Sequence, residues 1–183
     1  GALPFVIAAR IEAAVRAITG TGKSFLPEMI DENRYSSPKD RFRFSRLYLP
    51  GNNPGMFLNA GLHSPDGVIL DLEDSVAPER KDEARILVRN ALRAVNFYGA
   101  ERMVRINQGD RGLEDLSYVI PHNVHLILIP KCESADTVRR VDERINNIRE
   151  EAGVEHGVFL MPIIESAAGV ERAYDIAVAS PSV

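Results

Sequence analysis

One stretch decides the fold class: Val124-His125-Leu126-Ile127-Leu128-Ile129-Pro130-Lys131, which is apolar almost throughout and turns polar only at its carboxyl end. Short apolar runs of this kind, without alternation of polar and apolar residues, are typical of strands buried on both faces of a parallel sheet. We therefore predict five parallel strands, at residues 44–50, 67–72, 103–107, 125–130 and 158–165. The predicted helices of the same region cover residues 54–62, 78–96, 135–151 and 167–179.

Each predicted strand ends in polar or charged residues: Asn52, Asp71 with Glu73, Arg105 with Asn107, Lys131 and Glu165. In α/β folds, ligands bind at the carboxyl ends of the strands. The turn that follows the first strand, Pro50-Gly51-Asn52-Asn53-Pro54-Gly55, lacks the glycine pattern of a dinucleotide-binding fold. We therefore favour a (β/α)₈ TIM barrel, and because only five strands are counted we expect it to be incomplete, with its C-terminal strands beyond Val183.

The N-terminal part differs from the rest, and we expect two parts: a helix and arm at residues 1–43, and the N-terminal part of a TIM-barrel lyase domain at 44–183. Apolar residues recur at helical spacing over residues 2–18, and Gly20 ends that helix. Residues 23–43 are polar and irregular. We therefore expect this segment to be an arm that wraps the main domain, and not a second domain.

Composition and charge exclude several classes of protein. Lys and Arg number 22 against 26 Asp and Glu, so the net charge is −4, which does not fit a nucleic-acid-binding protein. Cys132 is the only cysteine, which excludes an internal disulfide and favours a cytoplasmic location. Arg10, Glu12 and Arg16 interrupt the apolar N-terminal stretch, so we expect no signal peptide and no membrane span.

Three short motifs invite a functional interpretation that their surroundings do not support. Gly22-Lys23-Ser24 is similar to the end of a phosphate-binding loop, but it follows a helix and lacks the first glycine, so a helix stop is favoured. His122 and His125 lack the helical spacing of a zinc-binding pair, and we favour a packing role. Ser166 lacks the preceding glycine of a nucleophile elbow, so we expect it to cap the following helix.

Three carboxylates, Asp71, Glu73 and Asp74, follow the second predicted strand and repel one another unless a cation or solvent relieves them. One interpretation is a solvated loop in which Asp74 or Ser75 caps the next helix. In the other, Asp71 or Glu73, which share a face, orients the guanidinium of Arg105 from the neighbouring strand. Arg105 then either forms a purely structural salt bridge to Glu73, or divides its fork between Glu73 and a substrate carbonyl or carboxylate.

Glu165 closes the last predicted strand, directly after Pro162-Ile163-Ile164. A carboxylate left unpaired in apolar surroundings is costly. Glu165 therefore either caps the next helix or binds a cation, and we favour the cation.

Taken in order, the motifs of the strand ends resemble those of a known family. They are Arg46-Leu47-Tyr48-Leu49-Pro50-Gly51, Val68-Ile69-Leu70-Asp71-Leu72-Glu73-Asp74-Ser75-Val76, Val104-Arg105-Ile106-Asn107, Ile129-Pro130-Lys131 and Ile164-Glu165-Ser166-Ala167. This ordered set is similar to the HpcH/HpaI aldolase and citrate lyase beta-subunit family, and within it to the CoA-ester lyases that include malyl-CoA and citramalyl-CoA lyases. The resemblance runs from Phe44 to the end of the chain.

The resemblance implies a Mg²⁺-dependent carbon–carbon lyase that cleaves or forms a 3-hydroxyacyl-CoA, with an oxo acid and an acyl-CoA as the other reactants. It implies that Arg105 holds the oxygens of the oxo acid, that Glu73 supports this arginine, and that Tyr48 lies where the first strand meets the CoA or the substrate. It implies that Glu165 binds Mg²⁺ and contacts the substrate through it. The second Mg²⁺ ligand, an aspartate, is expected beyond Val183.

The resemblance also implies a homo-oligomer, either a trimer or a hexamer. Two alternatives for the function stay open. One is an aldolase acting on free hydroxy-oxo acids without CoA, a subgroup that usually employs a histidine where this chain has Gly51-Asn52-Asn53. The other is a catalytically silent barrel that serves as a subunit, because a fold alone does not guarantee activity.

Overall fold

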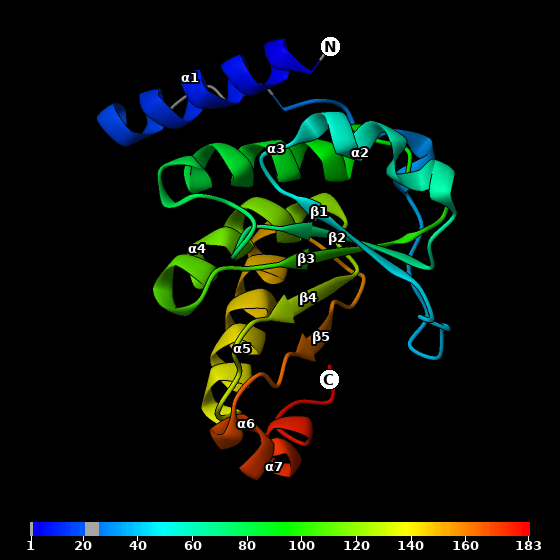
Figure 1. The fold of residues 1–183 in the computed structure, drawn as a ribbon, viewed down its shortest axis with the longest axis vertical. Coiled ribbons are helices and arrows are strands. Elements are labelled where there is room, and N and C mark those ends of the chain that lie inside the picture. Colours follow the sequence, from blue (N-terminus) through cyan, green and yellow to red (C-terminus); the bar gives the residue numbers. More distant parts are fainter. Residues whose placement is uncertain (1, 21–25) are drawn as a thin grey trace.

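A computed structural model describes residues 2–20 and 26–183 of the chain. Its five strands are β1 (Arg46–Pro50), β2 (Gly67–Asp71), β3 (Glu101–Arg105), β4 (Leu126–Ile129) and β5 (Phe159–Pro162). They form one sheet in the order β1-β2-β3-β4-β5, and every neighbouring pair is parallel (Figure 1). The five predicted parallel strands are therefore confirmed.

The strand order follows the sequence, and this distinguishes the fold from its main rival. A doubly wound sheet reverses its strand order at a switch point, whereas a (β/α)₈ barrel adds each strand beside the preceding one. The same winding continues after β5, because the segment that follows the last helix returns to the strand and the Leu160 amide donates to the Ser182 carbonyl at 2.8 Å. The chain thus forms five consecutive β/α units of a barrel.

Seven α-helices are present in the described residues: α1 (Leu3–Thr19), α2 (Pro54–Ala60), α3 (Lys81–Ala94), α4 (Gly109–Val119), α5 (Ala135–Ala152), α6 (Ala167–Glu171) and α7 (Ala173–Ala177). The sequence prediction lacked α4, whose first turn contains two glycines and therefore has low helix propensity. It also expected one helix over residues 167–179. The chain instead bends at Arg172, and the bend lets Ile176 of α7 pack in the core.

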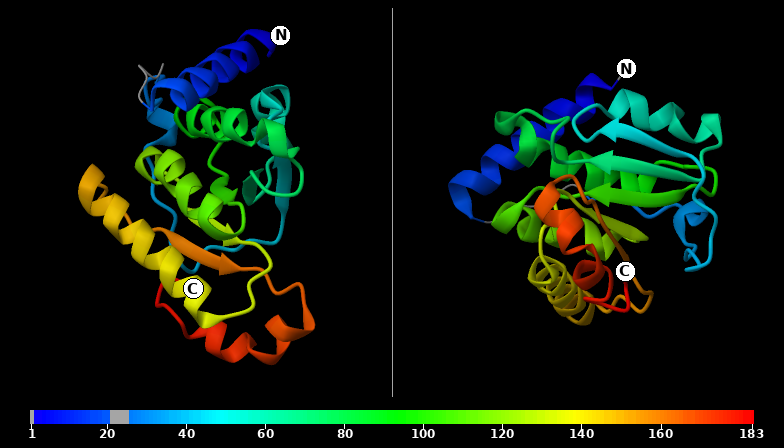
Figure 2. Two further views of the ribbon diagram at one scale, coloured as in Figure 1. Left: turned by 90° about the vertical axis from the view of Figure 1, so that its left-hand side faces the viewer. Right: turned by 60° about the horizontal axis from the view of Figure 1, so that its bottom comes forward.

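The two faces of the sheet carry different clusters of apolar side chains. Successive residues of a strand point to opposite faces, so Val68, Leu70, Val104 and Ile127 pack beneath the helices in the main core. Figure 2 shows α3, α4 and α5 on this same side of the sheet. The alternate residues Ile69, Met103, Leu126 and Leu128 form a smaller cluster on the other face, which is the interior of the barrel.

The N-terminal helix and the arm both pack against the barrel segment. Helix α1 lies along α3, and the arm passes under the amino ends of the strands (Figure 1). There the arm meets the fully buried Arg102, whose guanidinium donates to the carbonyls of Asn33 and Asn123. Gly20 adopts the left-handed conformation at the end of α1, as a helix stop requires. The motif Gly22-Lys23-Ser24 lies outside the described residues.

None of the helices within residues 2–20 and 26–183 has the length and apolar character that crossing a lipid bilayer requires.

Candidate active site

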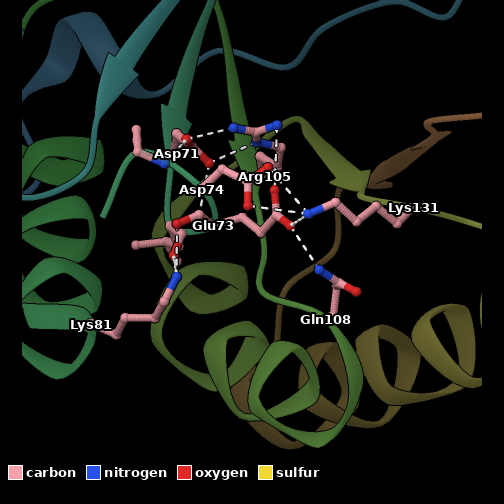
Figure 3. Close-up of polar contacts among 9 residues, drawn as sticks. Asp71, Glu73, Asp74, Lys81, Arg105, Gln108 and Lys131 are labelled. Atoms are coloured by element: carbon pink, nitrogen blue, oxygen red, sulfur yellow. Dashed lines mark hydrogen bonds and ion pairs between the residues drawn. The ribbon is translucent and has the colours of Figure 1, made fainter. Parts of the chain in front are cut away.

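Three neighbouring strands bring charged side chains together at their carboxyl ends. Asp71 is the last residue of β2 and Arg105 the last of β3, and the two are direct partners in the register of the sheet. Lys131 follows β4 by two residues. Figure 3 shows these side chains converging with Glu73, Asp74 and Gln108 from the adjoining loops and with Lys81 from the start of α3. The site therefore lies where the strand-end pattern predicts it.

Asp71 and Arg105 form a two-pronged ion pair at the centre of this cluster. Arg105 donates from Nε to Oδ1 and from Nη2 to Oδ2 of Asp71, both at 2.7 Å. Asp71 also accepts the backbone amides of Glu73 at 2.9 Å and Ser75 at 3.1 Å. Burial by itself raises the pKa of the Asp71 carboxyl, but these hydrogen bonds outweigh burial and hold the pKa below its ordinary value. The same pair raises the pKa of Arg105, which stays protonated.

This geometry shows how the two expected acids share Arg105. The resemblance implied that Glu73 supports the arginine, and Glu73 does form an ion pair with it, but the carboxylate that holds it with both oxygens is Asp71. Glu73 Oε2 lies 3.4 Å from Arg105 Nη1 and makes no hydrogen bond with the described residues. Asp71 is the closer partner because it lies directly opposite Arg105 in the sheet, whereas Glu73 lies in the loop after the strand.

Glu73 instead connects Arg105 to the next strand. Its Oε1 accepts from Lys131 Nζ at 2.7 Å and from Gln108 Nε2 at 2.8 Å. Lys131 also donates to Asp74 at 3.1 Å, and these two carboxylates raise the pKa of its amine. Asp74 thus binds a lysine of the site, and the alternative in which it caps the next helix is wrong.

Lys81 fixes the backbone of the acidic loop from below. Its ammonium donates to the carbonyls of Leu72 at 2.8 Å and Glu73 at 2.7 Å. Burial lowers the pKa of this amine, although the surrounding carboxylates oppose the shift. Sequence reasoning missed Lys81 and Gln108. Both lie outside the strand ends, one at the start of α3 and the other just before α4, and the sequence gives no local signal for either contact.

Tyr48 extends the site towards the interior of the barrel. It lies on β1, and the Cζ atom of Arg105 is 5.3 Å from the centre of its ring, within the range of a cation–π contact. The ring is about half exposed and lines an open hollow together with Leu128, Met161 and Ile164. Tyr48 therefore lies between the guanidinium of Arg105 and a hollow that a ligand can enter.

Glu165 stands apart from the ion-pair network. Its side chain is exposed and, within the described chain, takes part in no hydrogen bond or ion pair. The neighbouring Ser166 caps α6 by accepting the Gly169 amide at 3.1 Å, as predicted, and it donates to Glu133 at 2.6 Å. The interpretation in which Glu165 itself caps the helix is therefore wrong.

Whether Mg²⁺ fits this site depends on which carboxylates at the carboxyl ends of the strands are available to bind it. Asp71, Glu73 and Asp74 are all neutralised by Arg105 or Lys131. Among residues 2–20 and 26–183 no three His, Cys, Asp or Glu side chains cluster as a metal cage. Mg²⁺, however, is usually held by only one or two carboxylates, with water and substrate oxygens completing its shell. Glu165 fits such a single protein ligand.

The two histidines have structural partners, as expected. His122 Nδ1 lies 3.3 Å from the guanidinium of Arg93, and His125 contacts the Tyr35 carbonyl at 2.8 Å. They lie away from the strand ends that form the site.

The arrangement leaves Arg105 free to bind a further anion. A guanidinium has five N–H donors, of which Asp71 uses two. The side chain is only 15% exposed, so the remaining donors act in a partly desolvated place where their interaction with negative oxygens is strong. The site is thus suited to a small ligand with carboxylate or carbonyl oxygens.

The chain has clear relatives among known proteins. The beta subunit of citrate lyase from Haemophilus influenzae is 39% identical over 143 residues, which are 76% of this chain and 49% of that protein. The L-malyl-CoA/beta-methylmalyl-CoA lyase of Cereibacter sphaeroides (strain ATCC 17025 / ATH 2.4.3) is 36% identical over 149 residues, or 79% of this chain and 47% of that one. The chain therefore spans about half the length of these relatives.

A solved structure extends the likeness to three dimensions. The protein CitE of Mycobacterium tuberculosis, in complex with magnesium, acetoacetate and coenzyme A, superimposes with a TM-score of 0.55 at 29% identity. The match covers 76% of this chain and 47% of that one. The sequence profile of the HpcH/HpaI aldolase/citrate lyase family matches residues 45–183, three quarters of the chain. The chain belongs to the HpcH/HpaI aldolase/citrate lyase family.

Proposed function

We propose that the protein is a Mg²⁺-dependent carbon–carbon lyase that cleaves or forms a 3-hydroxyacyl-CoA, releasing or using an oxo acid and an acyl-CoA. The observation that carries the proposal is the fixed guanidinium of Arg105, clamped by Asp71 at a strand end with donors to spare. The names of the relatives and the magnesium, oxo acid and coenzyme A bound to the M. tuberculosis protein support the same choice.

Arg105 acts on the oxygens of the oxo acid. In the cleavage direction a base takes the proton of the substrate hydroxyl, and the carbonyl of the oxo acid forms as the carbon–carbon bond breaks. The electron pair of the broken bond passes to the enolate of the acyl-CoA, which then takes up a proton. Negative charge builds on the hydroxyl oxygen as its proton leaves, and a preorganised cation there lowers the barrier. The Asp71 fork supplies the preorganisation, because the guanidinium does not have to be oriented during the reaction.

Glu165 would hold the metal, with an aspartate after a sixth strand as the second protein ligand. Bound there, Mg²⁺ polarises the oxygens of an oxo acid. Tyr48 limits the freedom of the Arg105 side chain and faces the hollow in which the thioester would lie.

A lysine substitution tests the role of Arg105, and the chain offers a matched control. Lysine keeps the charge but lacks the planar fork, so it cannot grip Asp71 and a substrate at once. Arg43 makes the same kind of fork on Glu101, at 2.5 and 2.8 Å, with a side-chain exposure of 18%. It lies at the amino end of the sheet, away from the site, so both substitutions break one arginine–carboxylate fork.

We expect Arg105→Lys to lower kcat by about 100-fold or more in the full-length protein, with Mg²⁺ present, while Arg43→Lys changes stability and leaves kcat unchanged. The assay uses a panel of acyl-CoA thioesters with an oxo acid, and free hydroxy-oxo acids in parallel. Equal losses of activity in the two variants, proportional to their loss of folded protein, would reduce Arg105 to a structural residue. Turnover of the free acids alone would identify the CoA-independent aldolase instead.

A further inference from the structure

Helix α1 presents an apolar surface to the outside of the molecule. Leu3, Ile7, Ile11, Val15 and Ile18 lie on one side of the helix and are between 42% and 85% exposed. We call these five residues the outer ridge of α1. Scattered exposed apolar residues are common, but a continuous row of this kind on one element usually marks an interaction surface.

The charged side chains of α1 are engaged in ion pairs. Arg10 donates to Glu83 of α3 at 2.6 Å, and Glu12 accepts from Arg89 of α3 at 2.8 Å and from Arg16 at 3.0 Å. A surface helix normally turns its polar side outward and its apolar side inward. In α1 the charged side chains instead form ion pairs with α3 or with each other, and the five residues of the outer ridge carry no charge.

The spacing of the outward residues suits another helix. Ile7, Ile11, Ala14 and Ile18 follow intervals of four, three and four residues, and all four are exposed. This interval pattern places apolar side chains along the seam of two paired helices. At 17 residues, α1 is about 25 Å long, which is enough for several layers of such contacts.

None of the other elements in the described residues covers this surface. Helix α1 rests on α3, the helix between β2 and β3, and Figures 1 and 2 show it as the outermost element, at the end of the molecule opposite the C-terminus. The outer ridge is therefore open in the part of the chain that the structure describes.

We propose that two copies of the protein pair through the outer ridges of their α1 helices, antiparallel and centred near Ile11. An uncharged apolar ridge is self-complementary, as a two-fold interface requires. A lipid surface fits less well. Interfacial helices attract anionic lipids with free Lys and Arg on the polar face, whereas Arg10 and Arg16 of α1 are held by carboxylates. The surface lies outside residues 45–183, so it is independent of the proposed activity.

Disulfide trapping tests the pairing directly. Cys132, the only cysteine of the 183 residues, is buried, so Ile11→Cys introduces an exposed thiol at the centre of the proposed contact. We expect this variant of the full-length protein to form a covalent dimer under mild oxidation. Ala17→Cys places an exposed thiol on the flank of the same helix, away from the outer ridge, and should not form one.

The mass in solution provides the second measurement. We expect the double variant Ile7→Ser/Ile11→Ser to halve the molar mass measured by light scattering, whatever further assembly the barrel makes, with unchanged circular dichroism. Phe5→Ser removes an equally exposed apolar side chain from the other side of α1 and should keep the parent mass. An unchanged mass in the double variant, no link in Ile11→Cys, or binding of anionic vesicles by a protein that does not pair would each overturn the proposal.

Discussion

Two carboxylates at the end of β2, Asp71 in the strand and Glu73 in the loop after it, are both buried but have different roles. Asp71 is 1% exposed and gives both oxygens to Arg105, while Glu73 connects the site to Lys131 and Gln108. Periodicity places both acids on the same face of the strand and therefore does not decide which one holds the arginine. The register of β2 and β3, which places Asp71 opposite Arg105, determines which acid holds the arginine.

We expect Asp71→Asn to destabilise the protein by about 3–5 kcal/mol, because the asparagine leaves the partly buried charge of Arg105 without its counter-ion. Urea denaturation at neutral pH measures this loss. Glu73→Gln is the matched control. Its cationic partner Lys131 is 39% exposed and keeps Asp74, so the loss should be clearly smaller. Equal losses for the two variants would contradict the division of roles.

Glu165→Gln tests the proposed metal ligand without disturbing the fold. The substitution keeps the size of an exposed side chain and removes its charge, so we expect unchanged stability and at least a tenfold weaker affinity for Mg²⁺, about 1.4 kcal/mol. Isothermal titration of the full-length protein with Mg²⁺ measures the affinity. Glu171→Gln, at the end of α6, is an exposed acidic control that should bind Mg²⁺ normally. Normal binding by Glu165→Gln would end the metal assignment.

At the scale of elements, the sequence predicts the central strands well because β2 and β4 are buried throughout. The run over β4 is apolar from end to end, the run over β2 is apolar up to its last residue, Asp71, and both strands have the predicted positions within one residue at each end. The start of β3 was placed two residues late. Its first residues, Glu101 and Arg102, are charged yet fully buried, and their partners lie in the arm and in distant loops. The sequence pattern within a strand contains no information about partners that lie so far away in the chain.

The arm illustrates the same limit. Asn33 is fully buried, and its side-chain amide donates to the carbonyls of Leu92 at 3.0 Å and Val95 at 2.9 Å, at the end of α3. These contacts join residues about 60 positions apart, so an irregular polar segment gave only the expectation of a wrapping arm.

We expect Asn33→Ala to lower the free energy of unfolding by about 1–3 kcal/mol, because it leaves the carbonyls at the end of α3 without a donor. Chemical denaturation of this variant and of Asp31→Ala measures the effect. Asp31 lies in the same short turn, but its ion pair with Arg34 is exposed, and its loss should cost about 0.5 kcal/mol or less. A cost for Asn33→Ala as small as that control would show that the arm is not held by this contact.

At the scale of the whole molecule, the two ends of the sheet serve different purposes. The carboxyl ends carry the cluster around Arg105, with donors left for a ligand. The amino ends carry Arg43 with Glu101 and Arg102 with Asn33, and these groups are satisfied within the protein. This polarity is the one that a barrel imposes, with chemistry at one end and stability at the other. It explains why the fully buried Arg102 has no part in the proposed reaction.

The buried histidines make this stability depend on pH. Burial, assisted by Arg93, lowers the pKa of His122 to about 4, and burial, assisted by Arg102, does the same for His125. In the unfolded chain each histidine takes up a proton near pH 6.5. Between about pH 6.5 and 4 the unfolded state therefore binds more protons than the folded state, and the free energy of unfolding falls as the pH falls.

We expect each of these histidines to contribute a slope of about 1 kcal/mol per pH unit in that window, with stability greatest above pH 6.5. Urea denaturation at a series of pH values from 7.5 to 4.5 measures the slope. His125→Gln removes one titrating group and should flatten the curve, even if it lowers stability at pH 7.5. His63→Gln, on an exposed turn, is the control and should leave the slope unchanged. A parent protein whose stability is constant over this range would mean that the histidines are protonated in the fold, and that Arg93 and Arg102 do not exclude the additional charge.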